Sequence, residues 1–190
     1  FSKRLASMVA GAGLIGVAVA LLVQADLGLP PYDVMSSALS MRLGISLGQS
    51  GWLMAGSLFC VAAVLRHRPS PWGIAYILTI GVAIDSASGL LTRPETLVGR
   101  WVFVLAAVVL LASGVNLVVY SGTTGGPFEL LMLAGEDHGI NRIAVRYGLD
   151  IGVFGLGVIL GGSFGPATVV FALAFGLALK IIGQVLVDHG

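Results

Sequence analysis

The segment from Asp26 to Leu43, DLGLPPYDVMSSALSMRL, lies between two long apolar runs and decides the fold of this chain. Two adjacent prolines, Pro30 and Pro31, interrupt the apolar pattern, and Gly44 follows the residues that favour a helix. Proline at the first helical position and glycine just beyond the last are common boundaries of a helix. Because about 20 apolar residues are needed to cross a bilayer as a helix, this segment predicts a short helix that does not span a membrane.

A second segment of the same kind, GGPFELLMLAGEDHG, starts at Gly125. The corresponding residues, first copy first, are Pro31 and Pro127, Tyr32 and Phe128, Asp33 and Glu129, and the closing glycines Gly44 and Gly139. Gly125 and Gly126 precede the proline that opens the second short helix. Two short, capped, acid-bearing helices in corresponding places of two halves indicate the binding site of a transporter.

The composition indicates an integral membrane protein whose main partner is the lipid bilayer. Of the 190 residues, 57% are hydrophobic and 10% are charged, whereas globular domains carry roughly 25% charged residues. The formal net charge of +1 does not suggest a nucleic-acid partner. The three histidines are scattered, and no metal-ligand, nucleophile or phosphate-binding pattern is present. We therefore expect neither an enzyme nor a bound metal or cofactor.

Six apolar runs are long enough to cross the membrane. They cover approximately residues 5–23, 46–65, 71–91, 101–120, 141–160 and 166–187, with a short polar loop at 93–100. The short helices, 31–43 and 127–138, follow the first and the fourth run. Ser46 with Gln49 forms a capping-box pattern, and Asn141 is the expected N-cap of the fifth run. The predicted fold is thus an all-α membrane protein with six transmembrane helices and two short, re-entrant-like helices.

The two halves of the chain repeat at a nearly constant offset. Pairs of residues that lie 95 positions apart are Gly44 and Gly139, Ser46 and Asn141, Pro71 and Pro166, and Gly81 and Gly176. Residues 1–95 and 96–190 are therefore predicted to be the two halves of one compact membrane domain. Because each half has three spans, the second must enter the membrane from the opposite side, which defines a 3+3 inverted-topology repeat.

The positions of lysine and arginine predict the orientation. With a cytoplasmic N-terminus, the cytoplasmic side would hold Lys3, Arg4, Arg66, Arg68, Arg142 and Arg146, and the outer side Arg42, Arg93 and Arg100. This bias favours six spans with both termini in the cytoplasm and a location in the plasma membrane. Because the chain starts at Phe1 and lacks an initiating methionine, we expect further residues before it.

Three stretches carry a resemblance to a known family: ADLGLPPYDV at 25–34, LGISLGQSGW at 43–52 and PSPWGIAYILTIGVAIDSASGLL at 69–91. They resemble the YczE/YitT-type bacterial membrane proteins, which have an A-x-L-G-x-x-P-W-D-type block, a glycine-rich capping stretch and a G-T-x-x-N…G-x-x-I-D block, of which the Asn is missing here. Tyr32 stands where such proteins usually have tryptophan. The resemblance implies a bacterial multi-pass membrane protein with a transporter-like layout, and it defines the fold more closely than the activity.

The two acids of the short helices, Asp33 and Glu129, are the first candidates for a functional site. Each lies in the first turn, where an acid can simply compensate the helix dipole. Alternatively, the acids form a cation or proton site with the adjacent Tyr32 and Phe128. A site for an anion would leave the free backbone N–H groups bare, so the acids favour a cationic, zwitterionic or proton-coupled solute.

Other polar residues lie within the apolar runs. Asp85 and Lys180 are 95 positions apart, on opposite sides of the membrane midplane, and we expect no salt bridge between them. Asp85 should face the protein interior or a cavity, as a coupling or gating charge, whereas Lys180 can extend its stem to the membrane surface. Asn116 is either part of the solute path or an interhelical hydrogen-bond donor. Arg146 and Asp150, four residues apart, are expected to form a structural ion pair.

Together these features predict a small secondary transporter or channel-like permease for an unidentified small solute, with its site between the two halves. The alternative is a membrane accessory or regulatory protein that does not transport and acts through a partner. Assembly into a homo-oligomer is compatible with either function. A polar cavity that reaches the two acids would favour transport, and a dry, fully packed centre would favour the accessory role.

Overall fold

The structure is a computed structural model, and it describes residues 2–122 and 126–188. The described residues form helices joined by short connections, without a β-strand among them. In chain order the helices are α1 (Ser2–Ala25), α2 (Pro31–Leu43), α3 (Leu47–Val64), α4 (Pro71–Leu90), α5 (Leu97–Ser121), α6 (Pro127–Asp137), α7 (Arg142–Ile159) and α8 (Pro166–Asp188). Both short helices, α2 and α6, begin at the proline that the sequence indicates.

The helix ends are set by local chemistry. α2 ends at Gly44, whose φ of 65° lies in the left-handed region that glycine adopts easily. At the start of α3, the Ser46 side chain accepts from the Gln49 backbone N–H, and the Gln49 side chain accepts from the Ser46 N–H, both at 3.1 Å. The predicted capping box is therefore confirmed. Asn141 caps α7 as predicted, because its Oδ1 accepts from the Ile143 N–H at 2.8 Å.

One predicted boundary is wrong. Residues 97–100, expected in a polar loop, form the first turn of α5. The helix starts there because the Thr96 hydroxyl accepts a hydrogen bond from the Gly99 backbone N–H at 3.1 Å. This N-cap satisfies a donor that the first turn of a helix otherwise leaves unpaired, so Arg100 belongs to the helix.

Five of the described helices are long and apolar enough to cross a membrane: α1, α3, α4, α5 and α8. α7 has the same length as α3, 18 residues. It falls outside this set because it contains three charged residues, Arg142, Arg146 and Asp150. Large apolar side chains on the outside of the bundle, such as Leu90 (85% exposed) and Val64 (83% exposed), suit a surrounding of lipid. The chain is thus an all-α, multi-pass membrane protein.

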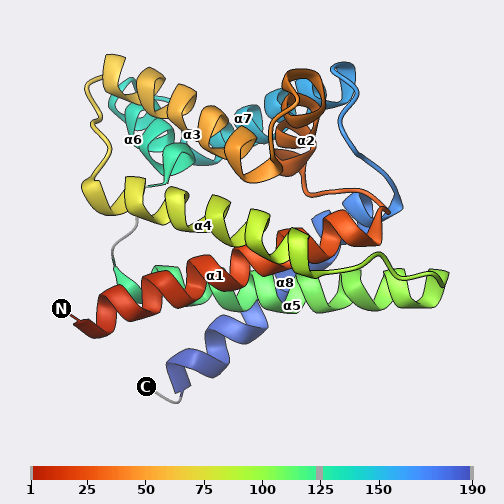
Figure 1. Cartoon of the computed structure of the whole chain (residues 1–190). Coiled ribbons are helices and arrows are strands. Elements are labelled where there is room, and N and C mark those ends of the chain that lie inside the picture. Colours follow the sequence, from red (N-terminus) through yellow and green to blue (C-terminus); the bar gives the residue numbers. More distant parts are fainter. Residues whose placement is uncertain (1, 123–125, 189–190) are drawn as a thin grey trace.

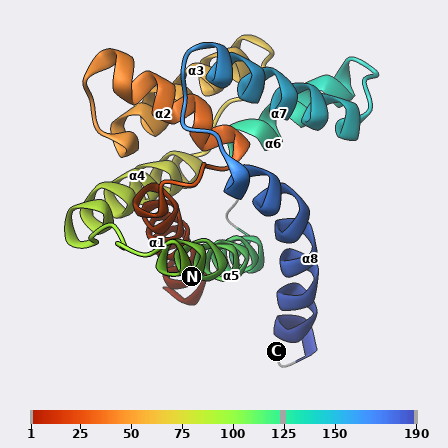
Figure 2. The ribbon, with the colours of Figure 1, turned by 90° about the vertical axis from the view of Figure 1, so that its right-hand side faces the viewer.

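The helices form two layers, visible in Figures 1 and 2. One layer contains α1, α4, α5 and α8, with α1 packed along both α4 and α5. α1 and α5 come very close at two glycines. A Cβ added to Gly11 would lie 2.6 Å from the Gly114 carbonyl oxygen, and a Cβ added to Gly114 would lie 2.7 Å from the Gly11 carbonyl oxygen. Only glycine at both positions permits this approach.

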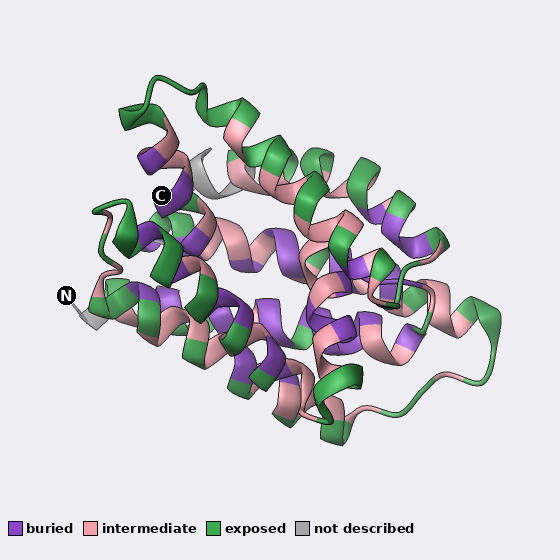
Figure 3. Ribbon diagram, turned by 90° about the horizontal axis from the view of Figure 1, so that it is seen from above, coloured by how far each residue is buried: buried purple, intermediate pink, exposed green. Residues whose placement is uncertain are grey.

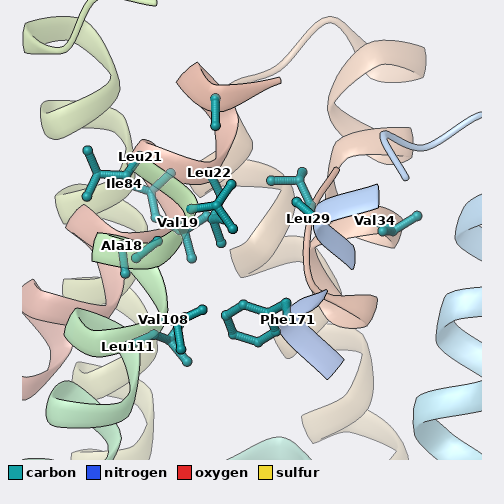
Figure 4. Packing of buried hydrophobic residues seen from close by; sticks show 14 residues of the cluster. Ala18, Val19, Leu21, Leu22, Leu29, Val34, Ile84, Val108, Leu111 and Phe171 are labelled. Carbon is teal, nitrogen blue, oxygen red and sulfur yellow. The ribbon is translucent and has the colours of Figure 1, made fainter. Parts of the chain in front are cut away.

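The main core lies between α1, α4 and α5 and continues into α8 and the start of α2 (Figure 4). Leu22 of α1 and Val104 of α5 are almost completely buried, and Phe171 of α8 packs against the same cluster. Seen from above, buried positions concentrate where the helices face one another, and exposed positions line the outer sides (Figure 3).

The second layer contains α2, α3, α6 and α7, and its contacts are paired across the two halves. α2 packs on α3 and on α7, and α6 packs on α7 and on α3. Three helices of the first half start 96, 95 and 95 residues before those of the second, at positions 31 and 127, 47 and 142, and 71 and 166. One contact differs between the two halves. α3 packs on α4, but the corresponding helices of the second half, α7 and α8, make no contact of similar extent among the described residues.

Candidate functional site at the short helices

The first turns of α2 and α6 meet through two half-buried aromatic rings. The Tyr32 and Phe128 rings contact each other edge to face, with their centroids 5.7 Å apart and an interplanar angle of 75°. Edge-to-face contacts of this kind stabilise by about 0.5–1.5 kcal/mol beyond the burial of area. The Tyr32 hydroxyl also donates to the Gly51 carbonyl of α3 at 3.4 Å. Two residues that the sequence places in corresponding positions are thus brought into direct contact.

The contact continues from α6 to α7. The Arg146 guanidinium lies over the Phe128 ring, 5.1 Å from its centroid, which is within the range of a cation–π interaction. Arg146 Nε in turn donates to Asp150 Oδ2 at 2.8 Å, so the predicted structural ion pair is confirmed. Tyr32, Phe128, Arg146 and Asp150 form a continuous series that joins α2, α6 and α7.

Asp33 lies beside this series, one residue after Tyr32. Its side chain is partly buried, and within the described residues it has no hydrogen bond or ion pair. Burial raises the pKa of Asp33 from its ordinary value near 4 to about 7. Burial also raises the pKa of Tyr32, and the neighbouring Asp33 and Tyr76 raise it further. Near neutral pH the Asp33 carboxyl can therefore hold or release a proton.

Glu129, the counterpart of Asp33, occupies a different environment. It is solvent-exposed, and within the described residues it makes neither a hydrogen bond nor an ion pair. The two acids correspond in sequence, but only Asp33 is withdrawn from solvent. The two short helices have matching starts, since Pro31 and Pro127 open them and Gly126 precedes the second. Gly125 lies outside the described residues.

Asp85 points into the protein, as expected for an acid in an apolar helix. Its Oδ2 accepts from the Ser46 hydroxyl at 2.6 Å, and its Oδ1 accepts from the Gly48 backbone N–H at 2.9 Å. Both carboxylate oxygens therefore hold α4 to the first turn of α3. The sequence pattern did not indicate this structural role, because residues 46 and 85 become neighbours only in the folded chain. As predicted, no ion pair joins Asp85 to Lys180.

Asn116 and Lys180 lie on the other side of the molecule, where α5 meets α8. The Asn116 amide donates to the Ala112 carbonyl of its own helix at 2.9 Å and to the Leu179 carbonyl of α8 at 3.1 Å. It is thus an interhelical donor, the structural alternative that the sequence analysis left open. The Lys180 side chain is exposed. Neither residue approaches the first turns of α2 and α6 through any described hydrogen bond.

A cavity of about 220 Å³ lies between the end of α1, one face of α2 and the connection before α8. Its polar lining consists of Asp26, Ser37, Ser40 and Ser163. The Ser37 hydroxyl accepts from the Ser163 backbone N–H at 2.8 Å, and Asp26 pairs with Arg93 at 2.7 Å. Neither Asp33 nor Glu129 lines this cavity. These residues were not predicted from the sequence; the available signal in α2 was the serines Ser37 and Ser40 within a largely apolar segment.

Within the described residues, no group of three or more His, Cys, Asp or Glu side chains could hold a metal ion. The candidate site therefore consists of a partly buried acid, two aromatic rings and an arginine–aspartate pair. It lies at the first turns of two short helices, α2 and α6.

The fold and the apolar helices define a multi-pass, all-helical membrane protein. Over residues 2–184 the chain matches the model of a family of unknown function, DUF6198, and it belongs to that family.

Two relatives support this assignment. The chain is 29% identical over 176 residues to the uncharacterized membrane protein YczE of Bacillus subtilis, which covers 90% of this chain and 81% of the relative. It is 26% identical over 179 residues to an uncharacterized protein of Haemophilus influenzae, which covers 94% of this chain and 82% of the relative. The resemblance to YczE-type proteins is therefore confirmed. No solved structure matches the chain.

Proposed function

We propose that this chain is a small secondary transporter or channel-like permease for a small cationic, zwitterionic or proton-coupled solute. The observation that carries the proposal is the position of Asp33. This acid lies in the first turn of a short helix, partly buried and without a described partner, where that helix contacts its counterpart in the other half. A charge in such a place is costly unless a ligand or a proton compensates it.

The proposed architecture is a 3+3 inverted repeat in which α7 also crosses the membrane, so that six helices span it. The helix starts at matching offsets and the matching contacts of α2 with α7 and of α6 with α3 support this arrangement. The pairing of Arg146 with Asp150 also lowers the cost of placing α7 in a membrane, because it compensates two of the three charges. Both termini would then lie on the same side, the cytoplasmic one according to the positive-inside bias.

In this proposal the Tyr32–Phe128 contact forms a barrier between the two halves, and Asp33 lies beside it. Ser37 is one helical turn after Asp33, and its hydroxyl lines the cavity of about 220 Å³. A solute that entered this cavity would have to move along α2 by about one turn to reach the acid. Protonation of Asp33 would remove the charge that holds a cation, which couples the solute to the proton.

The second candidate function is an accessory or regulatory membrane protein that acts through a partner. One specific observation favours it: neither Asp33 nor Glu129 lines the cavity of about 220 Å³ or the hollow between α5 and α8. A protein of this kind would need no continuous path for a solute. Asp33 would then titrate without coupling to any flux.

The test is solute uptake by proteoliposomes that contain the purified protein, with a panel of small cations and amino-acid-like zwitterions and an imposed pH gradient. Asp33→Asn should abolish uptake while insertion and folding persist. Glu95→Gln is the matched control, because Glu95 is an exposed acid in the connection between the halves and its loss should leave uptake unchanged. Uptake retained by Asp33→Asn, or a wild-type protein inert toward the whole panel, would favour the accessory role.

A further inference from the structure

The second notable hollow lies between α5 and α8, away from the short helices. It has a volume of about 510 Å³, and its wall includes Asn116 of α5 and Gly176, Lys180 and Gln184 of α8. The Asn116 amide bonds to the Leu179 carbonyl and so joins the two helices beside the hollow. A Cβ added to Gly176 would meet no other atom within 4 Å, so the hollow is open at this point.

Lys180 brings an uncompensated charge to this hollow. Its side chain is exposed, and no described residue forms an ion pair with it. Among the described residues, no carboxylate lines the hollow. Asp85, which lies 95 positions earlier, differs from Lys180 in this respect, because both of its carboxylate oxygens accept hydrogen bonds from the start of α3. Within the described part of the chain, Lys180 is therefore a cation that is available to an external anion.

The position of Lys180 along α8 indicates where that anion comes from. The residue lies fourteen positions after the helix start at Pro166, or about 21 Å at 1.5 Å per residue, which is beyond the middle of a hydrocarbon core about 30 Å thick. A lysine stem at this depth extends toward the headgroup layer of the nearer leaflet. The neighbouring surface of α8 is apolar and exposed, with Leu173 at 77% and Leu177 at 62%. That surface suits an acyl chain.

We propose that the hollow between α5 and α8 binds an anionic phospholipid, with its phosphate at Lys180 and an acyl chain along the exposed face of α8. Gln184 adds a hydrogen-bond donor at the same wall of the hollow. The charge of Lys180 selects the anionic headgroup, and Gly176 leaves the space that the lipid occupies. This binding site is independent of the transport proposal and would serve an accessory protein equally well.

The test measures lipid binding to the delipidated protein in detergent micelles by native mass spectrometry, with phosphatidylglycerol as the probe. Lys180→Gln should raise the apparent Kd about tenfold or more, a loss of about 1.4 kcal/mol per factor of ten, whereas Lys180→Arg should retain binding. Gly176→Leu fills the hollow without removing the charge, and it should also abolish binding. Arg68→Gln, which removes an exposed cation from the connection between α3 and α4, is the matched control and should bind as the wild type does.

Two further probes separate the sources of phosphate. Phosphatidylcholine, which carries no net charge, should bind at least several-fold more weakly than phosphatidylglycerol. Inorganic phosphate alone should not displace the lipid. Equal binding of both lipids, or unchanged binding by Lys180→Gln and Gly176→Leu, would show a non-specific lipid shell and overturn the proposal. Displacement by inorganic phosphate would identify a site for free anions and overturn it as well.

Discussion

At the scale of single residues, the contrast between Asp33 and Glu129 is the main finding. Both acids occupy the first turn of a short helix, yet Glu129 is exposed and Asp33 is partly buried beside Tyr32. Helix-dipole compensation needs no burial, so it accounts for Glu129 and leaves the position of Asp33 unexplained. The raised pKa of Asp33 is the physical sign of that difference.

This pKa shift leads to a prediction on stability. Because the pKa of Asp33 is higher in the folded protein, about 7, than in an unfolded chain, about 4, protonation favours folding. The stability contributed by the protonated acid is complete below about pH 4 and is lost as the pH rises to about 7. The neighbouring Tyr32 and Tyr76 belong to a residue type that ordinarily titrates near pH 10, outside this window.

Asp33→Asn removes this dependence, so its melting temperature relative to the wild type should increase between pH 4 and pH 7 and stay constant above. Thermal unfolding in detergent at a series of pH values measures the difference. Glu95→Gln, tested in parallel, should show no such trend. A difference between Asp33→Asn and the wild type that is independent of pH would contradict the prediction.

At the scale of elements, the α1–α5 contact is the structural centre of the first layer. Gly11 and Gly114 allow the two backbones to touch, and a Cβ at either position would approach a carbonyl oxygen to 2.6–2.7 Å. Gly114→Ala should therefore destabilise the protein by about 1–3 kcal/mol, as overpacking does, despite the better helix propensity of alanine. Gly13→Ala is the control, because a Cβ there meets nothing within 4 Å. Thermal unfolding of both variants checks this, and an equal response would show that the contact is not tight.

The N-terminal end of α3 gives a second prediction at this scale. Asp85 supplies two acceptors, one to the Ser46 hydroxyl and one to the Gly48 N–H. Asp85→Ala should cost about 1–3 kcal/mol, because it leaves buried donors without a partner. Lys180→Ala, at the corresponding position of α8, removes a charge that has no described partner and should have little effect on the melting temperature. Similar losses in both variants would show that Asp85 does not hold α3 and α4 together.

At the scale of the whole molecule, the contact pattern predicts a topology. The start of α1 and the end of α8 lie toward the same end of the bundle in Figures 1 and 3. If α7 spans the membrane in addition to the other five long helices, reporter proteins fused to the two ends of the chain should both be cytoplasmic. A reporter inserted at 161–165, between α7 and α8, should be on the outside. If the two terminal fusions report opposite sides, α7 does not span and the inverted repeat is wrong.

The sequence by itself determined the membrane class, the two short helices and most helix boundaries. These properties are local: prolines, glycines and capping residues act within one turn, and an apolar run of sufficient length needs no distant partner to favour lipid. The ion pair of Arg146 with Asp150 was predictable for the same reason, since four residues separate its members.

Only the tertiary structure decided how the equivalent residues differ. Burial of Asp33 but not of Glu129, attachment of Asp85 to α3 and isolation of Lys180 in a hollow each depend on which helices pack together. Corresponding helices start at a nearly constant offset, but α3 packs on α4 while α7 does not pack on α8 in the same way. Packing depends on side chains that lie far apart along the chain, so residues with matching positions in two halves can still occupy different environments.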